Sequence, residues 1–294
     1  MKFVVVGASG FIGRCMLDHV RNEGFDAVGT RASAADENLL RFDLNSDRIA
    51  DCLPAGFFVE GVPVYAAVFA CVCQLDRCRR ERETSYRINV RQTIQLLDDL
   101  AQLGAKPVFI SSSYVHDGRT GYYTEESPPS PINEYGQHKL EVEQYIDKHL
   151  PQALVLRLDK IVGDEPTTSH LFTEWYRWID EGRSITCIAD QILSPTLSTD
   201  VARAVVAGCE QELNGLYNVA NTEFIERAEL ARQFAAICGR EAAIVSKPMD
   251  AFNFDDARPL KSYLDSSKFI RATGMRFTTM RETMEAFVAK ARGA

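Results

Sequence analysis

A tyrosine and a lysine stand one helical turn apart in the segment Tyr135-Gly136-Gln137-His138-Lys139. Residues at this spacing lie on one face of a helix. A phenol, whose ordinary pKa is about 10, serves as an acid–base only where its phenolate is stabilised, and a nearby ammonium does this. The pair therefore favours a proton donor for the alkoxide that forms when hydride adds to a carbonyl group.

A serine hydroxyl extends this constellation. Ser112 follows the apolar, strand-like segment 108–111, and the carboxyl ends of strands in a parallel α/β sheet face the ligand crevice. Its hydroxyl can hydrogen-bond the same carbonyl oxygen. Tyr135 and Lys139 alone could be an ordinary exposed helical pair, but a preceding strand that ends in serines makes the combination more specific. We predict that these three residues act together.

A glycine-rich turn, Gly7 to Gly13, follows an apolar segment and opens an amphipathic pattern over 11–22. Glycines here allow a tight turn and a close approach of the backbone to a pyrophosphate, and the helix N-terminus offers free N–H groups. The alternative is a strand-to-helix turn with incidental glycines. The strand–turn–helix context favours a dinucleotide site. Its predicted contacts are Gly7, Ser9, Gly10, Phe11, Ile12 and Gly13.

The next strand-like segment, 26–29, bears on which dinucleotide binds. NAD enzymes usually place Asp or Glu about 20 residues beyond the turn, against the adenosine ribose. Here the segment ends Val28-Gly29-Thr30-Arg31, with no carboxylate at its tip. The Arg31 guanidinium can pair with a 2′-phosphate, although it could equally be a solvated loop residue. We predict NADP, with NAD as the alternative.

Two alternating hydrophobic periodicities predict the strands and helices that position these residues. Continuous apolar runs alternate with amphipathic helical patterns, which predicts an α/β fold with a doubly wound parallel sheet. The predicted strands are 3–6, 26–29, 64–70, 108–111 and 154–158, and the helices 11–22, 85–103 and 135–150. We predict a nucleotide-binding domain over 1–160. A smaller α+β, substrate-binding domain is predicted over 161–294, with part of 198–220 returning to the first domain's sheet.

Composition excludes several classes of protein. The net charge of −8 and the pI near 5.3 disfavour nucleic acid or an anionic membrane as partner. No apolar run approaches the roughly 20 residues of a membrane span, and the short apolar start lacks a cleavage site. These features predict a cytoplasmic protein.

The chain has eight cysteines, three of them at Cys71, Cys73 and Cys78. Without an export signal a disulfide framework is disfavoured, and the spacing lacks the knuckles of a structural zinc site. Because Cys71 and Cys73 alternate along an apolar run, we predict buried free thiols and no metal. His116 and His138 flank the predicted site and are expected to be loop and helix-surface residues.

The glycine turn, the serine-ended strand and the Tyr135–Lys139 pair, in this order, resemble the extended short-chain dehydrogenase/reductase superfamily. Within it the chain is most similar to the dTDP-4-dehydrorhamnose reductase branch. Segment 112–118, Ser-Ser-Tyr-Val-His-Asp-Gly, resembles that branch's Ser-Thr-Asp-Tyr-Val-Phe-Asp-Gly. Segments 190–196 and 258–268 resemble its Asp-Gln-x-Gly-Ser-Pro-Thr block and its Arg-Pro and Leu-Asp-x-Ser-Lys pattern.

The resemblance implies a Rossmann domain with a nucleotide-sugar-binding C-terminal domain, paired as a homodimer. It makes Ser112, Tyr135 and Lys139 the catalytic triad, with Tyr135 and Lys139 also contacting the cofactor. The remaining residues expected to contact cofactor or substrate are Asp43 and Leu44 at the adenine, and Ser113, Tyr114, Lys160 and Arg258 at the substrate.

Two departures from the branch concern the substrate. The acidic residue before its tyrosine is missing at Ser112-Ser113, and its Arg-Thr-Ser-Trp segment reads Arg157-Leu158-Asp159-Lys160. The acids of nucleotide-sugar dehydratases are also lacking. The predicted function is NADPH-dependent reduction of a keto group on a nucleotide-linked 4-keto-6-deoxy sugar. Two alternatives stay open: an epimerase that retains NAD, and a non-catalytic NADP-binding subunit like the beta subunit of methionine adenosyltransferase.

Overall fold

The computed structural model describes residues 1–33 and 35–293, and a parallel sheet forms its larger part. The strands of this sheet are β1 (Lys2–Val6), β2 (Asp26–Arg31), β3 (Leu40–Arg41), β4 (Val64–Val68), β5 (Ala105–Ser112), β6 (Leu154–Leu158) and β11 (Gly215–Val219). They form a seven-stranded sheet in the order β11-β6-β5-β4-β1-β2-β3, and every neighbouring pair is parallel. The predicted α/β class with a doubly wound parallel sheet is confirmed.

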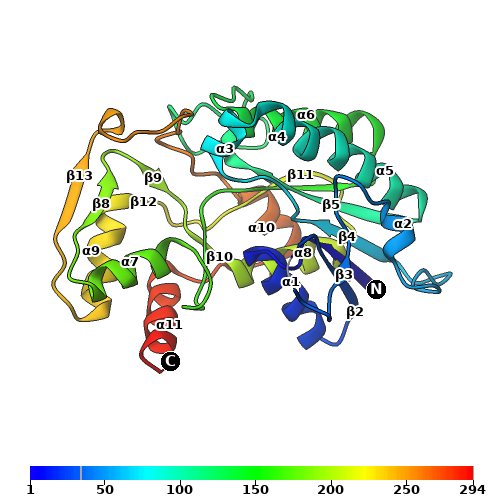
Figure 1. Ribbon diagram of the computed structural model, residues 1–294, viewed down its shortest axis with the longest axis horizontal. Coiled ribbons are helices and arrows are strands. Elements are labelled where there is room, and N and C mark those ends of the chain that lie inside the picture. The colour runs from blue at the N-terminus through cyan, green and yellow to red at the C-terminus, as the bar shows by residue number, and fades with distance from the viewer. Residues whose placement is uncertain (34, 294) are drawn as a thin grey trace.

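Helices cover both faces of this sheet. In Figure 1, α5 (Thr93–Gln102) and α6 (Glu134–His149) lie above it, and α1 (Phe11–Asn22) and α8 (Ser198–Glu210) lie below it. Successive residues of β1 pack on opposite faces of the sheet. Phe3 and Val5 pack in the core on the α1 side, and Val4 and Val6 pack in the core on the α5 side. This alternation is why the strands read as continuous apolar runs.

The predicted helix over 85–103 is irregular. It consists of α4 (Arg82–Tyr86), a π-helical segment η1 (Arg87–Gln92) and then α5. The wider π-turn carries the buried Asn89, which faces the segment that follows β4. π-Turns are rare and often lie at functional sites.

A second, smaller core lies at the other end of the molecule, at the left of Figure 1. Here α7 (Leu171–Asp180), α9 (Arg227–Cys238) and α11 (Met280–Gly293) pack around buried aromatic rings. Phe172 and Phe234 stack at 4.9 Å between ring centroids, beside the fully buried Trp175. β8 (Ile185–Ile188) and β13 (Ile244–Lys247) form a parallel pair at its edge.

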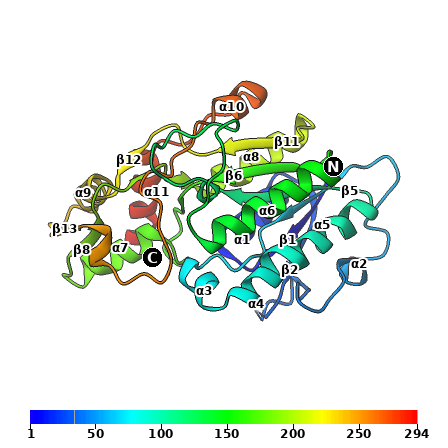
Figure 2. The ribbon, with the colours of Figure 1, turned by 90° about the horizontal axis from the view of Figure 1, so that it is seen from above.

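Short elements connect these parts, and Figure 2 shows several of them from above. They are α2 (Ile49–Cys52), α3 (Leu75–Arg80), η2 (Ser113–Val115), β7 (Ile161–Val162), β9 (Ile192–Leu193), β10 (Thr196–Leu197), β12 (Ile225–Glu226), η3 (Met249–Ala251) and α10 (Ser267–Thr273). Although α8 and β11 follow residue 160 in the chain, β11 pairs with β6 at the edge of the main sheet. The domain boundary near residue 160 stays a prediction.

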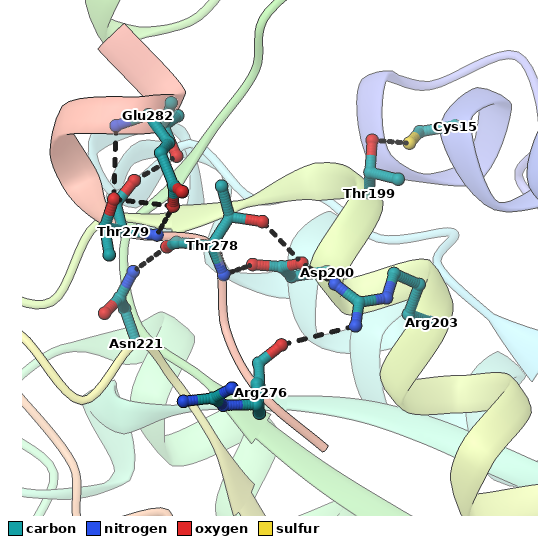
Figure 3. Close-up of polar contacts among 10 residues, drawn as sticks. Cys15, Thr199, Asp200, Arg203, Asn221, Arg276, Thr278, Thr279 and Glu282 are labelled. Atoms are coloured by element: carbon teal, nitrogen blue, oxygen red, sulfur yellow. Dashed lines mark hydrogen bonds and ion pairs between the residues drawn. The ribbon is translucent and has the colours of Figure 1, made fainter.

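A buried carboxylate fastens the C-terminal segment to α8. Asp200 accepts the Thr278 N–H at 2.7 Å and also pairs with Arg203, while the Asn221 amide donates to the Thr278 carbonyl at 2.7 Å (Figure 3). Thr279 and Glu282 then form a reciprocal capping box at the start of α11. These contacts fix where the last helix begins.

The close approach of α1 to the end of β1 depends on a glycine. A Cβ atom on Gly13 would lie 2.2 Å from the Gly7 carbonyl oxygen, whereas one on Gly10 would meet nothing nearer than 3.4 Å. Gly7 itself has a φ of +87°. The glycine turn is therefore a packing requirement as well as a feature of the predicted cofactor site.

Gly13→Ala should lower the free energy of unfolding by about 1–3 kcal/mol, because the added methyl forces α1 away from β1. Gly10→Ala is the matched control and should change it by less than about 0.5 kcal/mol. Urea denaturation followed by circular dichroism measures both. Equal midpoints for the two variants would contradict the packing argument.

Candidate active site

The site lies where the carboxyl ends of the parallel strands meet. Gly7 follows β1, Cys71 comes shortly after β4, Ser112 ends β5, and Asp159 follows β6. Since neighbouring strands in this sheet run the same way, these ends share one edge, where ligands bind in open α/β folds.

Helix α6 brings the predicted tyrosine and lysine to this edge. Its N-cap residue Asn133 accepts the Gly136 N–H at 2.8 Å. A Cβ atom on Gly136 would lie 2.0 Å from the Tyr114 carbonyl oxygen, so only glycine lets the helix start this close to η2. The Lys139 ammonium lies 5.6 Å from the centre of the Tyr135 ring and donates to the Ile110 carbonyl at 2.7 Å.

The serines after β5 are held in different ways. The Ser112 hydroxyl accepts the Tyr114 N–H at 3.2 Å, which leaves its own proton for another acceptor. Ser113 donates instead to the Asp159 carboxylate at 2.9 Å. The Tyr114 ring stands perpendicular to the Tyr135 ring, with 6.4 Å between the ring centroids. The structure thus brings Ser112, Ser113, Tyr114, Tyr135 and Lys139 to the same edge of the sheet.

Burial keeps the tyrosines protonated. Desolvation raises the pKa of Tyr135 well above its ordinary value, and negative charge on Cys71 raises it further. Burial likewise raises the pKa of Tyr114 to about 12, with the Asp159 carboxylate adding to the shift. In the ligand-free protein the Tyr135 phenol therefore carries its proton, as a general acid must.

An ion pair under α6 fixes the helix to the sheet. Glu143 accepts the Arg157 guanidinium at 2.6 and 2.9 Å and also binds the Ser111 hydroxyl. Both charged side chains are less than a tenth exposed. Since Ser111 precedes Ser112, this contact sets the position of Ser112 relative to Tyr135.

His116 lies in the loop after η2, as expected, whereas the expectation that His138 lies on a helix surface is wrong. Both are buried. His116 stacks on Tyr123 at 4.2 Å between ring centroids, and burial together with Arg157 lowers its pKa to about 4. The Nδ1 atom of His138 lies 3.4 Å from the Asn89 amide nitrogen. Neither packing partner could be seen in the local sequence.

The predicted cofactor contacts surround the start of α1. Ser9 and Gly10 are exposed there, and Gly10 caps the helix without a side-chain bond, which leaves its first N–H groups available. Arg31, at the end of β2, donates to the Asp36 carbonyl at 2.7 Å, and Arg14 pairs with the Asp36 carboxylate. The residues therefore fit a dinucleotide phosphate.

Asp43 and Leu44, predicted to lie at the adenine, follow β3. Leu44 is buried in the core under α5, and the Asp43 N–H is bound by the Asp47 carboxylate at 2.7 Å. Phe11 stacks on His170 from the C-terminal half at 5.2 Å between ring centroids. Ile12 and Gly13 lie within α1.

The predicted substrate residues lie toward the C-terminal half. Lys160 is half-buried, and desolvation, followed by the charge of Arg227, lowers the pKa of its ammonium. Arg258 already pairs with Asp76 at 2.8 Å and lines a cavity of about 480 Å³ at the start of α6. A phosphate would therefore meet an arginine whose charge Asp76 partly balances.

Sequence reasoning missed Arg227 and the role of Asp159. Arg227 begins α9, and its buried Nε has no partner among the described residues. Asp159 accepts the Ser194 N–H at 2.7 Å in addition to the Ser113 hydroxyl, so it joins β5 to the C-terminal half. The Arg227 Nη1 atom donates to Gln191 at 2.9 Å, and an arginine so far along the chain gives no local signal of its nearness to the site.

The prediction of buried thiols at Cys71 and Cys73 is wrong. β4 ends at Val68, so both cysteines lie beyond the strand, Cys71 half-buried and Cys73 exposed. Cys78 is buried, and all three are free thiols. Within residues 1–33 and 35–293 no group of three potential metal ligands gathers. No helix in the same ranges is long and apolar enough to cross a bilayer.

Comparison with known proteins decides the family. The model of the RmlD substrate binding domain matches residues 1–292. The chain belongs to this family. The expected resemblance to extended short-chain dehydrogenases/reductases of the dTDP-4-dehydrorhamnose reductase branch is therefore confirmed.

Relatives within the family differ in what they do. The chain is 26% identical to the probable low-salt glycan biosynthesis reductase Agl14 of Haloferax volcanii, over 98% of each protein. It is 30% identical to methionine adenosyltransferase 2 subunit beta of Danio rerio, over 78% of this RmlD-family chain and 71% of that protein. In structure it matches a Bacillus anthracis dTDP-4-dehydrorhamnose reductase in complex with NADP, with a TM-score of 0.83 at 24% identity, covering 99% and 100% of the two chains.

Glu143→Gln should lower the free energy of unfolding by about 3–5 kcal/mol, because it leaves the buried Arg157 charge unpaired. Asp147→Asn, an exposed carboxylate one turn later on α6, is the matched control and should change stability by less than about 0.5 kcal/mol. Urea denaturation measures both. A Glu143→Gln midpoint equal to the control's would contradict the role of the ion pair.

Proposed function

We propose that this RmlD-family protein is an NADPH-dependent reductase that acts on a keto group of a nucleotide-linked 4-keto-6-deoxy sugar. The observation that carries the proposal is the placement of Tyr135 and Lys139 on one face of α6 beside Ser112, at the carboxyl edge of the sheet. The Agl14 and dTDP-4-dehydrorhamnose reductase relatives support the reaction type.

The roles follow from the contacts. Bound NADPH supplies hydride to the substrate carbonyl carbon. Tyr135 gives its phenolic proton to the carbonyl oxygen, and the Lys139 ammonium stabilises the phenolate that results. Ser112 donates its free O–H to the same oxygen and orients the carbonyl. Lys160 and Arg258 are the proposed contacts for the nucleotide diphosphate.

Tyr135→Phe should reduce NADPH oxidation by about 10²- to 10⁴-fold, since it removes the proton donor while keeping the ring. Tyr145→Phe, on the same helix with its hydroxyl bound to Asp98, is the matched control. The assay follows NADPH absorbance with a panel of dTDP-, UDP- and GDP-4-keto-6-deoxy sugars. Undiminished turnover by Tyr135→Phe would overturn the assignment of the proton donor.

The preference for NADP rests on the guanidinium group of Arg31 at the end of β2. Arg31→Ala should weaken NADPH binding by about 10- to 100-fold and leave NADH binding nearly unchanged, because a charged hydrogen bond to the 2′-phosphate is lost. Arg21→Ala, an exposed arginine of α1, serves as the control. Fluorescence titration gives the dissociation constants. Equal losses for both cofactors would argue against 2′-phosphate recognition.

One specific similarity favours a second function. The 30% identity to methionine adenosyltransferase 2 subunit beta supports a non-catalytic, NADP-binding subunit. Sedimentation with a methionine adenosyltransferase catalytic subunit distinguishes the two, and also tests the expected homodimer. No NADPH oxidation with any sugar of the panel, together with a stable mixed complex, would favour the subunit. NAD retained through purification would favour an epimerase.

A further inference from the structure

The strap, defined here as residues 248–258, follows β13 and passes beside α3, as the orange segment of Figure 1 shows. Pairing of β13 with β8 fixes one end, and just beyond the other end the Lys261 N–H donates to the Gly118 carbonyl at 2.9 Å. Within residues 1–33 and 35–293, the backbone hydrogen bonds of segment 248–254 stay inside the strap. Residues 255–258 make its polar contacts with the rest of the molecule.

A single carboxylate receives most of these contacts. Asp76, in the first turn of α3, accepts the N–H groups of Asp255 and Asp256 at 3.0 and 3.3 Å. The same Oδ1 atom pairs with Nη2 of Arg258 at 2.8 Å. The Asp255 carboxylate also pairs with Arg80 at 3.3 Å, but both side chains are exposed and such pairs contribute little. Asp76 is therefore the main fastening between the strap and α3.

The strap also contacts the start of α6, the helix that carries Tyr135. The Asp256 carboxylate accepts the Glu134 N–H at 3.0 Å, one of the N–H groups that a helix leaves without an internal partner. The Asn133 amide donates to the Ala257 carbonyl at 3.1 Å. Strap residues and the start of α6 together line the cavity of about 480 Å³. One wall of this cavity therefore depends on the contacts that hold the strap.

The same contacts orient the Arg258 guanidinium. Its Nη1 donates to the Asp256 carbonyl at 3.0 Å, and the Phe254 ring lies against one face, 4.4 Å from the guanidinium carbon. With Asp76 at Nη2, the side chain is 13% exposed. A guanidinium has five N–H donors, so donors remain for a ligand in the cavity. Because Asp76 also holds two backbone N–H groups, a phosphate can share Arg258 with it and need not displace it.

We propose that Asp76 is a positioning residue for the substrate: it holds the strap closed and presents Arg258 to the diphosphate of the nucleotide. Asp76 acts through Arg258 and the strap backbone and has no part in the hydride or proton transfer. The inference deepens the proposed reductase function and rests on it for the identity of the ligand. A carboxylate that merely occupied Arg258 until a phosphate replaced it would have the opposite effect on affinity.

The first measurement is limited digestion with chymotrypsin, with the fragments identified by mass. Cleavage after Phe252 and Phe254, both half-buried, reports opening of the strap. Asp76→Ala should raise this rate more than about tenfold, because it removes several hydrogen bonds to a charged group. The exposed Phe224 is the internal reference site. Glu83→Ala, an exposed first-turn acid on α4, is the matched control and should be cut like the wild type.

Two further variants make this measurement specific. Asp76→Asn keeps an oxygen that can accept both strap N–H groups, so its cleavage rate should lie between those of the wild type and Asp76→Ala. Arg80→Ala removes only the exposed ion pair with Asp255 and should stay within about twofold of the wild type. Unchanged cleavage of Asp76→Ala, or equally fast cleavage of Arg80→Ala, would overturn the role of Asp76 as the fastening.

The second measurement titrates dTDP, UDP and GDP onto the protein by calorimetry. Asp76→Ala should weaken binding of the nucleotide that the wild type prefers by about tenfold or more, since Arg258 is no longer held in place. NADPH binding should stay within about twofold, because the predicted cofactor contacts lie on α1, and this also shows that the variant folds. In the sugar assay KM should rise more than kcat falls. Tighter nucleotide binding by Asp76→Ala would overturn the proposal.

Failure of this inference can be told from failure of the proposed function. A wild-type chain that binds none of the three nucleotides and oxidises no NADPH with any sugar of the panel would refute the proposed function. Chymotrypsin cleavage needs no ligand, so it would still decide whether Asp76 holds the strap closed. A strap that opens in Asp76→Ala while nucleotide affinity is unchanged would refute the positioning of Arg258 alone.

Discussion

The attachment of α6 to the ends of β5 and β6 is the constraint on which the site depends. Lys139 binds the Ile110 carbonyl, and one turn later Glu143 binds Ser111 and Arg157. Ser112 comes next in the chain. The distance between the serine hydroxyl and the Tyr135 phenol is thereby fixed by contacts that contain neither group. A site whose supporting contacts are buried and charged holds its geometry without a bound ligand.

The buried ammonium of Lys139 also sets the balance of charge at the site. It can favour a Cys71 thiolate or a Tyr135 phenolate, and each anion disfavours the other because like charges repel strongly at low dielectric. While Cys71 is ionised, Tyr135 holds its proton more tightly. A reductase needs that protonated phenol at the start of the reaction. An ionised Cys71 therefore favours the protonation state of Tyr135 that the proposed reaction requires.

Local patterns predicted the parts of the fold that local sequence controls. The glycine turn, the apolar strands and the Tyr135 helix follow from short periodicities, and α1 spans the predicted 11–22. The predictions for the segment 71–73 and for His138 were wrong for one shared reason. Both pack against Asn89, whose position depends on a π-turn within an otherwise helical pattern. No residue type in the sequence predicts such a π-turn. Likewise Arg227, at the start of α9, comes near Lys160 and Tyr114 only through the tertiary packing of the C-terminal half.

Asp159 stands where the dTDP-4-dehydrorhamnose reductase branch has another residue, and the structure shows what its carboxylate binds. Its carboxylate receives the Ser113 hydroxyl and the Ser194 N–H, while desolvation raises its pKa. The group therefore serves as a junction between β5, the residues after β6 and the C-terminal half. A carboxylate committed to two donors makes a poor general acid for dehydration, because it must give up both before it can reach a substrate. In the proposed reductase the proton for the carbonyl oxygen comes from Tyr135, and the sequence lacks the acids expected of a dehydratase.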